Sequence, residues 1–129
     1  MGSYLAKINE IPDLIISSSA LRAIQTLENT ISAGNWESKI NIEKEVYHAS
    51  VSTLIDIIKR TKNIYSNICI IGHEPTFSYF IKSITDESIF KFPTATMAKV
   101  VLKVESWNKI DEKLSKLLWI KKPKELASF

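Results

Sequence analysis

The sequence has few of the residues that would point to a secreted, membrane-spanning or metal-dependent protein. It contains one cysteine, Cys69, so an intramolecular disulfide is excluded. No apolar stretch approaches the roughly 20 residues that a transmembrane helix needs, and no basic-then-apolar segment resembles a signal peptide. No group of histidines, cysteines and acidic residues has the spacing of a metal site, and we expect no cofactor. The cytoplasm is therefore the default location.

The sequence also contains few arginines and carries a low net charge. Two arginines stand beside fifteen lysines, and the formal net charge is +3. Residues 99–129 hold eight lysines and four acidic residues, but these form no basic stripe interleaved with aromatic residues. Such a distribution is typical of a solvated face, and we expect no nucleic-acid partner.

The chain has 129 residues and is 45% hydrophobic, which is enough for one domain with one core. Apolar runs predict strands, and periodic segments behind capping residues predict helices. Strands are predicted at residues 13–17, 39–42, 67–71, 97–104 and 117–120, the last two as an antiparallel pair. Helices are predicted to end within residues 3–10, to run from Ser18 or Ser19 to Gly34, and to start at Ser50 and Pro75. This alternation predicts one layered α/β domain over residues 1–129.

Two of the predicted strands are followed by residues that suit an anion. The strand at 13–17 leads into SSALRA, which puts Arg22 in the first turn of a helix, and the strand at 67–71 leads into Gly72 and His73. Open α/β sheets bind ligands beyond the carboxyl ends of their strands, where helix N-termini offer unpaired N–H groups. Arg22 adds a fork of donors that matches phosphate oxygens. The pattern predicts a phosphate-type anion site.

Each of these residues also has an ordinary structural explanation. Arg22 is equally well placed to be a surface residue of its helix, and a single histidine after a strand is commonly held by structural hydrogen bonds. Arg60 is expected on a solvated helix face. Cys69, between two isoleucines, is expected to be a small core residue. It does not fit a cysteine phosphatase, because the arginine required six residues later is replaced by Pro75.

Longer segments of the sequence favour the phosphate site over the structural explanations. PDLIISSSALRAIQTLE (12–28) resembles the S-x-x-x-R-A-x-Q-T segment of the histidine phosphatase superfamily, and IIGHEP resembles its second-histidine motif. EVYHAS (45–50), FPTATMAKVVL (92–102) and the closing PKEL are similar to segments of the small SixA-type phosphohistidine phosphatases. The resemblance covers nearly the whole chain in order.

The resemblance implies a three-layer, phosphoglycerate-mutase-like sheet and a phosphohistidine phosphatase that uses no metal. The implied substrate is a phosphorylated protein or a small phosphate ester. By the same resemblance Arg22 and His73 would clamp the phosphoryl group, and Thr94 would add a donor. Glu45 is the candidate general acid; the alternative is a surface acid beside Lys44.

The chain departs from this family most severely at its start. In the family the first strand ends in an Arg-His pair, and that histidine is the nucleophile that becomes phosphorylated. Here the two histidines are His48, preceded by Tyr47, and His73, preceded by Gly72, so neither fits. Glu74 also stands where the family often has asparagine, which puts a negative charge near the pocket. Two alternatives to a competent phosphatase follow: a non-catalytic phosphate- or phosphoprotein-binding remnant, and a fragment with no role of its own.

The opening MGSYLAKI resembles the middle of the family's first long helix, which implies an N-terminally truncated domain. The resemblance places the missing strand between the strands at 13–17 and 67–71, whose edges would then be unpaired. Closing the sheet by direct pairing moves strands by about 4.8 Å for each missing strand and leaves the covering helices poorly packed. We therefore expect self-association through the gap, or marginal stability.

Overall fold

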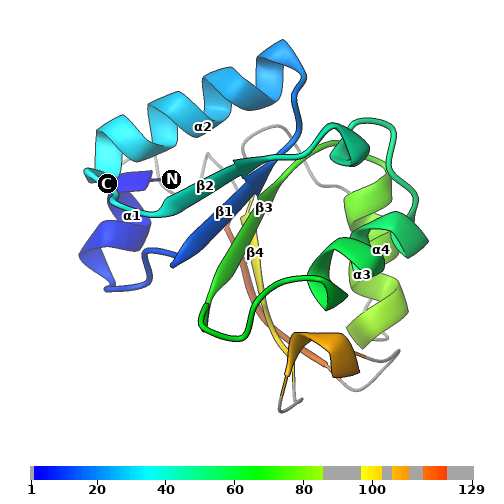
Figure 1. The fold of residues 1–129 in the computed structure, drawn as a ribbon. Helices are drawn as coiled ribbons and strands as arrows, with labels where there is room; N and C mark the ends of the chain where they lie inside the picture. Colours follow the sequence, from blue (N-terminus) through cyan, green and yellow to red (C-terminus); the bar gives the residue numbers. More distant parts are fainter. Residues whose placement is uncertain (1, 86–96, 103–105, 111–114, 122–129) are drawn as a thin grey trace.

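The protein has a three-layer α/β fold in this computed structural model, which describes residues 2–85, 97–102, 106–110 and 115–121. Helices α1 and α2 lie on one side of the strands and α3 and α4 on the other (Figure 1). In chain order the elements are α1 (Gly2–Lys7), β1 (Leu14–Ser17), α2 (Leu21–Gly34), β2 (Lys39–Ile42), the 3-10 helix η1 (Lys44–Val46), α3 (Val51–Lys59), β3 (Ile68–Ile71), α4 (Thr76–Thr85), β4 (Met97–Val101), the 3-10 helix η2 (Trp107–Lys109) and β5 (Lys116–Lys121). The predicted α/β class is confirmed. Among the described residues no helix is both long and apolar enough to cross a membrane.

Three parallel strands form the sheet that positions the site, in the order β2-β1-β3. β1 is central and buried along its whole length, with β2 on one side and β3 on the other. From β1 the chain turns into α2 on one face of the sheet, and from β3 it turns into α4 on the opposite face (Figure 1). The carboxyl ends of β1 and β3 therefore form a topological switch point, where sheets of this kind bind ligands.

The direct pairing of β1 with β3 shows that the expectation of a gap between them is wrong. Leu14 lies opposite Ile68 and Ser17 opposite Ile71. The ladder continues past the end of β1, where the Ser18 N–H donates to the carbonyl of Ile71 at 2.9 Å. The open edge lies elsewhere: in the described part of the chain, no strand pairs with the other edge of β3.

The core lies on both faces of β1. On one face Leu14 and Ile16 belong to a buried cluster with Leu54 of α3. On the other face Ile15 belongs to a cluster with Leu27 of α2. All five side chains are at most 5% exposed. The helices that cover β1 are therefore well packed, contrary to the expectation that closing the sheet would leave them poorly packed.

β4 and β5 form a separate antiparallel pair. This confirms the antiparallel pairing predicted for 97–104 and 117–120, although residues 103 and 104 lie outside the described part of the chain. The rings of Tyr4 and Trp119 meet edge to face with centroids 6.1 Å apart, which joins α1 to β5. The pair is thus anchored to the same helical layer that covers β1.

Two predicted helix starts are corrected by the structure. The N-cap residue of α2 is Ala20, which has no side-chain cap; Ser18 instead accepts the N–H of Ala20 on its Oγ at 3.1 Å. α4 begins at Thr76 and not at Pro75. Ser50 caps α3 as predicted, since its side chain accepts a hydrogen bond from the third residue of the helix.

Cys69 on β3 packs against the cluster that contains Ile15, as the prediction of a core residue requires. Although part of the residue is exposed, burial of the thiol raises its pKa to about 12. A thiol that stays protonated at neutral pH is a poor nucleophile, so Cys69 offers no covalent chemistry.

The burial of β1 gives a direct stability test. Ile15 is 0% exposed, so an Ile15→Ala substitution should lower the free energy of unfolding by about 2–5 kcal/mol. The matched control is Ile64→Ala, because Ile64 is 76% exposed and should change stability by no more than about 0.5 kcal/mol. Urea denaturation followed by circular dichroism measures both. Equal effects would mean that β1 is not the centre of the sheet in solution.

Candidate anion-binding site

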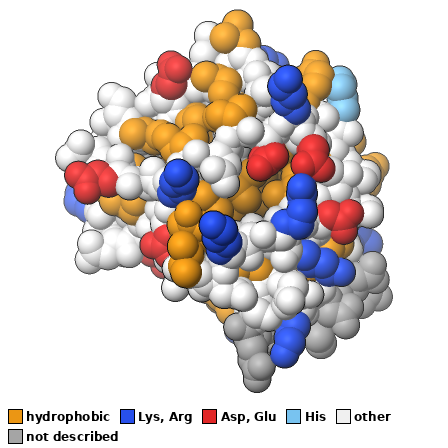
Figure 2. Space-filling view, in the orientation of Figure 1, with side chains coloured by type: hydrophobic (Ala, Val, Ile, Leu, Met, Phe, Trp, Pro, Cys, Tyr) orange, Lys and Arg blue, Asp and Glu red, His pale blue; other side chains and the backbone are white. Residues whose placement is uncertain are grey.

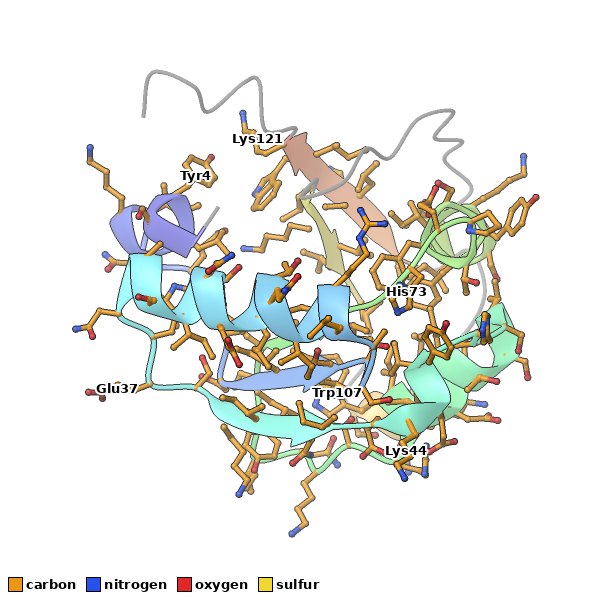
Figure 3. The ribbon with its side chains drawn as sticks, turned by 90° about the horizontal axis from the view of Figure 1, so that it is seen from above. Tyr4, Glu37, Lys44, His73, Trp107 and Lys121 are labelled. Atoms are coloured by element: carbon orange, nitrogen blue, oxygen red, sulfur yellow. The ribbon has the colours of Figure 1, made fainter. Side chains whose placement is uncertain are left out.

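The loops that follow β1 and β3 bring Ser18 and His73 together. The Ser18 Oγ and the His73 Nε2 lie 2.8 Å apart, although the residues are far apart in the sequence. Figure 3 shows His73 beside the start of α2 and next to α4. The sequence placed His73 at this edge of the sheet but did not identify Ser18 as its partner. The sequence held a signal for this contact. Ser18 directly follows the strand at 13–17 and His73 comes just after the strand at 67–71, and the carboxyl ends of neighbouring parallel strands lie at the same edge of a sheet.

The hydrogen bonds of Ser18 fix how His73 is held. Ser18 is fully buried, and its Oγ already accepts the N–H of Ala20. Its hydroxyl proton can be donated to Nε2 of the neutral His73 tautomer that is protonated on Nδ1, and its second lone pair can accept from the Nε2–H tautomer. When His73 is protonated, Nε2–H donates to Ser18. In the Nδ1–H tautomer and in the protonated ring, His73 keeps an Nδ1–H donor for a ligand.

Gly72 allows the turn into His73 by leaving space. A Cβ atom at Gly72 would lie 2.9 Å from the ring of Phe77 and 2.9 Å from a methyl group of Val46. Its backbone is not in the left-handed region, so the glycine is needed for close approach rather than for an unusual conformation. This packing fixes the end of β3 against both α4 and η1.

Arg22 lies near enough to His73 to act on its charge. The pKa of His73 is lowered from 6.5, first by burial, next by the positive charge of His48 and then by that of Arg22. The Arg22 side chain is exposed, and within the described residues it forms no hydrogen bond or ion pair. A free guanidinium beside a histidine donor is a site for an oxyanion. Arg22 is therefore close enough to affect the charge of His73, and the shared role of the two residues in binding an anion stays a prediction.

Tyr47 and His48 also border the site, which the sequence did not predict. The Tyr47 ring meets the His73 ring edge to face at 5.4 Å and lies 4.0 Å from the His48 ring. His48 is exposed and has a left-handed backbone, with φ at 59°. His48 precedes α3, and Thr76 ties this loop to the start of α4 by donating to the Ala49 carbonyl at 2.6 Å.

The Glu74 carboxylate is bonded at the start of α4. One carboxylate oxygen accepts the Ser78 N–H at 2.8 Å, and the other accepts the Ser78 hydroxyl. The carboxylate therefore caps the N-terminus of α4 and interacts favourably with its dipole. One N–H at that helix end is therefore already bonded, whereas the first turn of α2 has no side-chain cap.

Of the two other predicted site residues, Glu45 is paired with another side chain and Thr94 is not among the described residues. Glu45, the candidate general acid, lies in η1 and forms an ion pair with Arg60 at 2.8 Å, with both side chains about half exposed. This ion pair fits the alternative that Glu45 is a surface acid. The same contact raises the pKa of Arg60. Thr94 lies outside the described residues. In the described part of the chain no three histidine, cysteine or acidic residues are grouped to hold a metal ion.

The fold has counterparts among solved structures. No protein-family model and no curated protein matches the chain. The protein assigned as phosphohistidine phosphatase SixA from Nakamurella multipartitia matches with a TM-score of 0.80 and 17% identity, over 95% of this chain and 77% of that one. Its counterpart from Agrobacterium tumefaciens gives 0.77 and 23%, over 95% and 75%. The protein histidine phosphatase SixA complexed with tungstate gives 0.79 and 22%, over 97% and 78%. The chain therefore has the SixA fold, of the phosphoglycerate-mutase-like kind that the resemblance implied.

The electrostatic contact between Arg22 and His73 is testable without a ligand. An Arg22→Gln substitution should raise the pKa of His73, because a nearby positive charge that opposes protonation is removed. NMR titration of the imidazole signals measures this pKa, and a His48→Asn variant assigns the two histidines. Arg60→Gln is the matched control and should leave His73 unchanged. An unchanged His73 pKa in Arg22→Gln would show that Arg22 does not act on His73, and it would contradict the candidate site.

Proposed function

We propose that this chain binds the phosphoryl group of a phosphorylated histidine, or of a small phosphate ester, in the manner of a phosphohistidine phosphatase. The observation that carries the proposal is the meeting of His73, Ser18 and Arg22 at the carboxyl ends of β1 and β3. Three solved structures with this fold are described as SixA-type phosphatases, and one of them holds tungstate, a tetrahedral oxyanion like phosphate.

The chemistry of the site suits phosphoryl binding. Arg22 offers planar donors to the equatorial oxygens, and the Nδ1–H of His73 offers another. Unpaired N–H groups in the first turn of α2 add the positive end of a helix dipole. Because these groups are fixed by the fold, they stabilise negative charge without rearrangement. The leaving imidazole of a phosphohistidine would face the exposed side, where Tyr47 and His48 lie.

The same geometry argues against His73 as the nucleophile. Covalent transfer needs a ring nitrogen with a free lone pair aimed at phosphorus. Nε2 is hydrogen-bonded to Ser18, and in the Nδ1–H tautomer the other ring nitrogen carries a proton, so that tautomer offers no free lone pair. Glu45 is not part of the proposed site, because its carboxylate is bonded to Arg60. We therefore infer that this chain binds phosphoryl groups without hydrolysing them.

The competing proposal is a complete enzyme, in which an Arg-His strand completes the sheet. The unpaired edge of β3 supports that proposal, because this strand ends at Gly72 and His73. A strand parallel to β3 on that edge would bring its own carboxyl end to the anion site. DNA sequence upstream of Met1 separates the two proposals: an in-frame strand ending in Arg-His favours the enzyme, and an in-frame stop favours the binding protein.

The proposed site predicts that Arg22, but not Arg60, contributes to the affinity for phosphate. Arg22→Gln should weaken the binding of inorganic phosphate or tungstate by about 1.5–3 kcal/mol, roughly 10- to 150-fold, since a charged hydrogen bond to the anion is lost. Arg60→Gln should bind with the affinity of the unmodified chain, because Arg60 is paired with Glu45. Isothermal titration calorimetry measures both. Equal affinities in all three proteins would show that Arg22 is a surface residue that does not bind the anion.

Activity gives an independent test. The chain should release no phenolate from p-nitrophenyl phosphate above background, and no phosphohistidine should form on the protein, because neither histidine occupies the position of the family's nucleophile. Phosphate binding with no turnover is the expected result. Turnover that disappears in a His73→Ala variant, with a phosphohistidine trapped on the chain, would show that His73 has taken the nucleophile's role.

A further inference from the structure

β2 forms an outer edge of the parallel sheet, and in the described residues no strand pairs with that edge. The N–H of Lys39 donates to Asp13 at 3.0 Å, and the N–H of Glu43 donates to Ser17 at 2.8 Å. In a parallel ladder alternate residues point to opposite sides, so Ile40 and Ile42 direct their N–H and C=O groups away from the sheet. Four backbone groups are thus available to another strand.

The residues of this edge are complementary to themselves when the strand is reversed. The segment reads KINIE over residues 39–43, with Asn41 at its centre. Antiparallel pairing of two copies about Asn41 sets each lysine opposite a glutamate and each Ile40 opposite an Ile42. We propose that β2 of one copy pairs with β2 of a second copy in this register, which makes a symmetric dimer with one continuous sheet.

The hydrogen-bond pattern agrees with this register. In an antiparallel pair, directly opposite residues that face each other exchange both of their N–H···O=C bonds. Ile40 of one copy and Ile42 of the other are directly opposite, and both direct their backbone groups outward. The pairing satisfies the four outward groups of each β2, whereas a shift by one residue would set outward-facing groups opposite inward-facing ones.

The charged ends of the segment have no ion-pair partner within one copy. Neither Lys39 nor Glu43 forms an ion pair with another described side chain, although Arg60 lies near enough to Glu43 to sense its charge. Lys39 and Glu43 are about 13 Å apart along an extended strand, too far to pair with each other. In the proposed register they occupy closely spaced, non-hydrogen-bonded positions, where opposite charges on facing strands attract.

The isoleucines give the pairing an apolar component. Ile40 is 41% exposed and Ile42 is 47% exposed, which is unusual for two isoleucines in one short strand. Ile40 lies beside Ile15 in the sheet, so both isoleucines project to the face that α2 covers. Figure 2 shows hydrophobic side chains at the surface on the side of α2 and β2, with charged side chains among them. A facing strand would bury part of this apolar surface.

The proposed dimer is separate from the anion site and from the open edge of β3. β2 and β3 lie on opposite sides of β1, so a second copy on β2 leaves His73 accessible (Figure 1). Association at β2 therefore does not depend on the proposed phosphoryl binding. It also differs from the self-association through a gap that the sequence suggested.

Sedimentation equilibrium between about 10 µM and about 1 mM protein tests the dimer, because an interface of one short strand pair is small and its affinity is weak. The chain should form dimers as concentration rises. Lys39→Glu should weaken association by about tenfold or more, since two attractive pairs become repulsive. Adding Glu43→Lys to that variant should restore it, because the charges are exchanged and remain complementary.

Two further variants keep the test specific. Ile42→Pro removes one outward N–H without touching the β1 ladder, and it should abolish the dimer while thermal melts confirm that the domain is folded. Lys59→Glu makes the same charge change on the exposed surface of α3 and should leave association unchanged. A chain that stays monomeric throughout, or a dimer that is indifferent to Lys39→Glu and Ile42→Pro, would overturn the proposal. So would a failure of the double variant to restore association.

Discussion

The parallel pairing of β1 with β3 is the interaction on which the site depends. It extends one residue beyond β1, where Ser18 donates its N–H to Ile71, and this bond holds the Ser18 hydroxyl level with the turn that follows β3. Gly72 keeps that turn close to the packed core, so His73 emerges within hydrogen-bond distance of Ser18. A shift of one residue in this register would turn the side chains of β3 to the opposite faces and separate the two residues. The site is therefore a consequence of strand register.

Positive charge gathers near His73, because Arg22 lies close to it and forms no ion pair with any described residue. Burial disfavours a charged His73 most, and His48 and Arg22 add to the effect. A histidine whose pKa is lowered on folding binds protons more readily in the unfolded chain. Its contribution to stability is present above the unfolded pKa of about 6.5 and is lost as pH falls through the lower folded value. A bound dianion reverses this balance, because it favours the protonated ring that the empty site disfavours.

The sequence predicted most of the fold because local patterns determine it. The apolar runs at 14–17 and 68–71 are short, bounded by breakers and rich in isoleucine, and both are strands. What the sequence did not supply was the order of strands in the sheet, because a buried strand pairs equally well with several neighbours. The expected gap between β1 and β3 came from the resemblance rather than from the residues, and the direct pairing of the two strands contradicts it.

The same distinction applies to the site. Arg22 and His73 were identifiable because strand ends and helix starts are readable along the chain. Ser18, Tyr47 and His48 were not, since their roles come from contacts between loops that are distant in sequence. The charge of Glu74 was readable from the sequence, whereas its hydrogen bonds to Ser78 at the start of α4 were not.

The position of Glu74 makes the N-terminus of α4 different from the N-terminus of α2. The Glu74 carboxylate places negative charge at the start of α4, which offsets the positive end of that helix dipole. The start of α2 has no side-chain cap, and Arg22 lies in its first turn.

In the proposed site the donors come from β1, α2 and the turn after β3, which one strand register holds together. In the competing proposal the nucleophile comes from an element that pairs with the other edge of β3. The two proposals therefore assign phosphoryl binding and chemical attack to different elements of the fold.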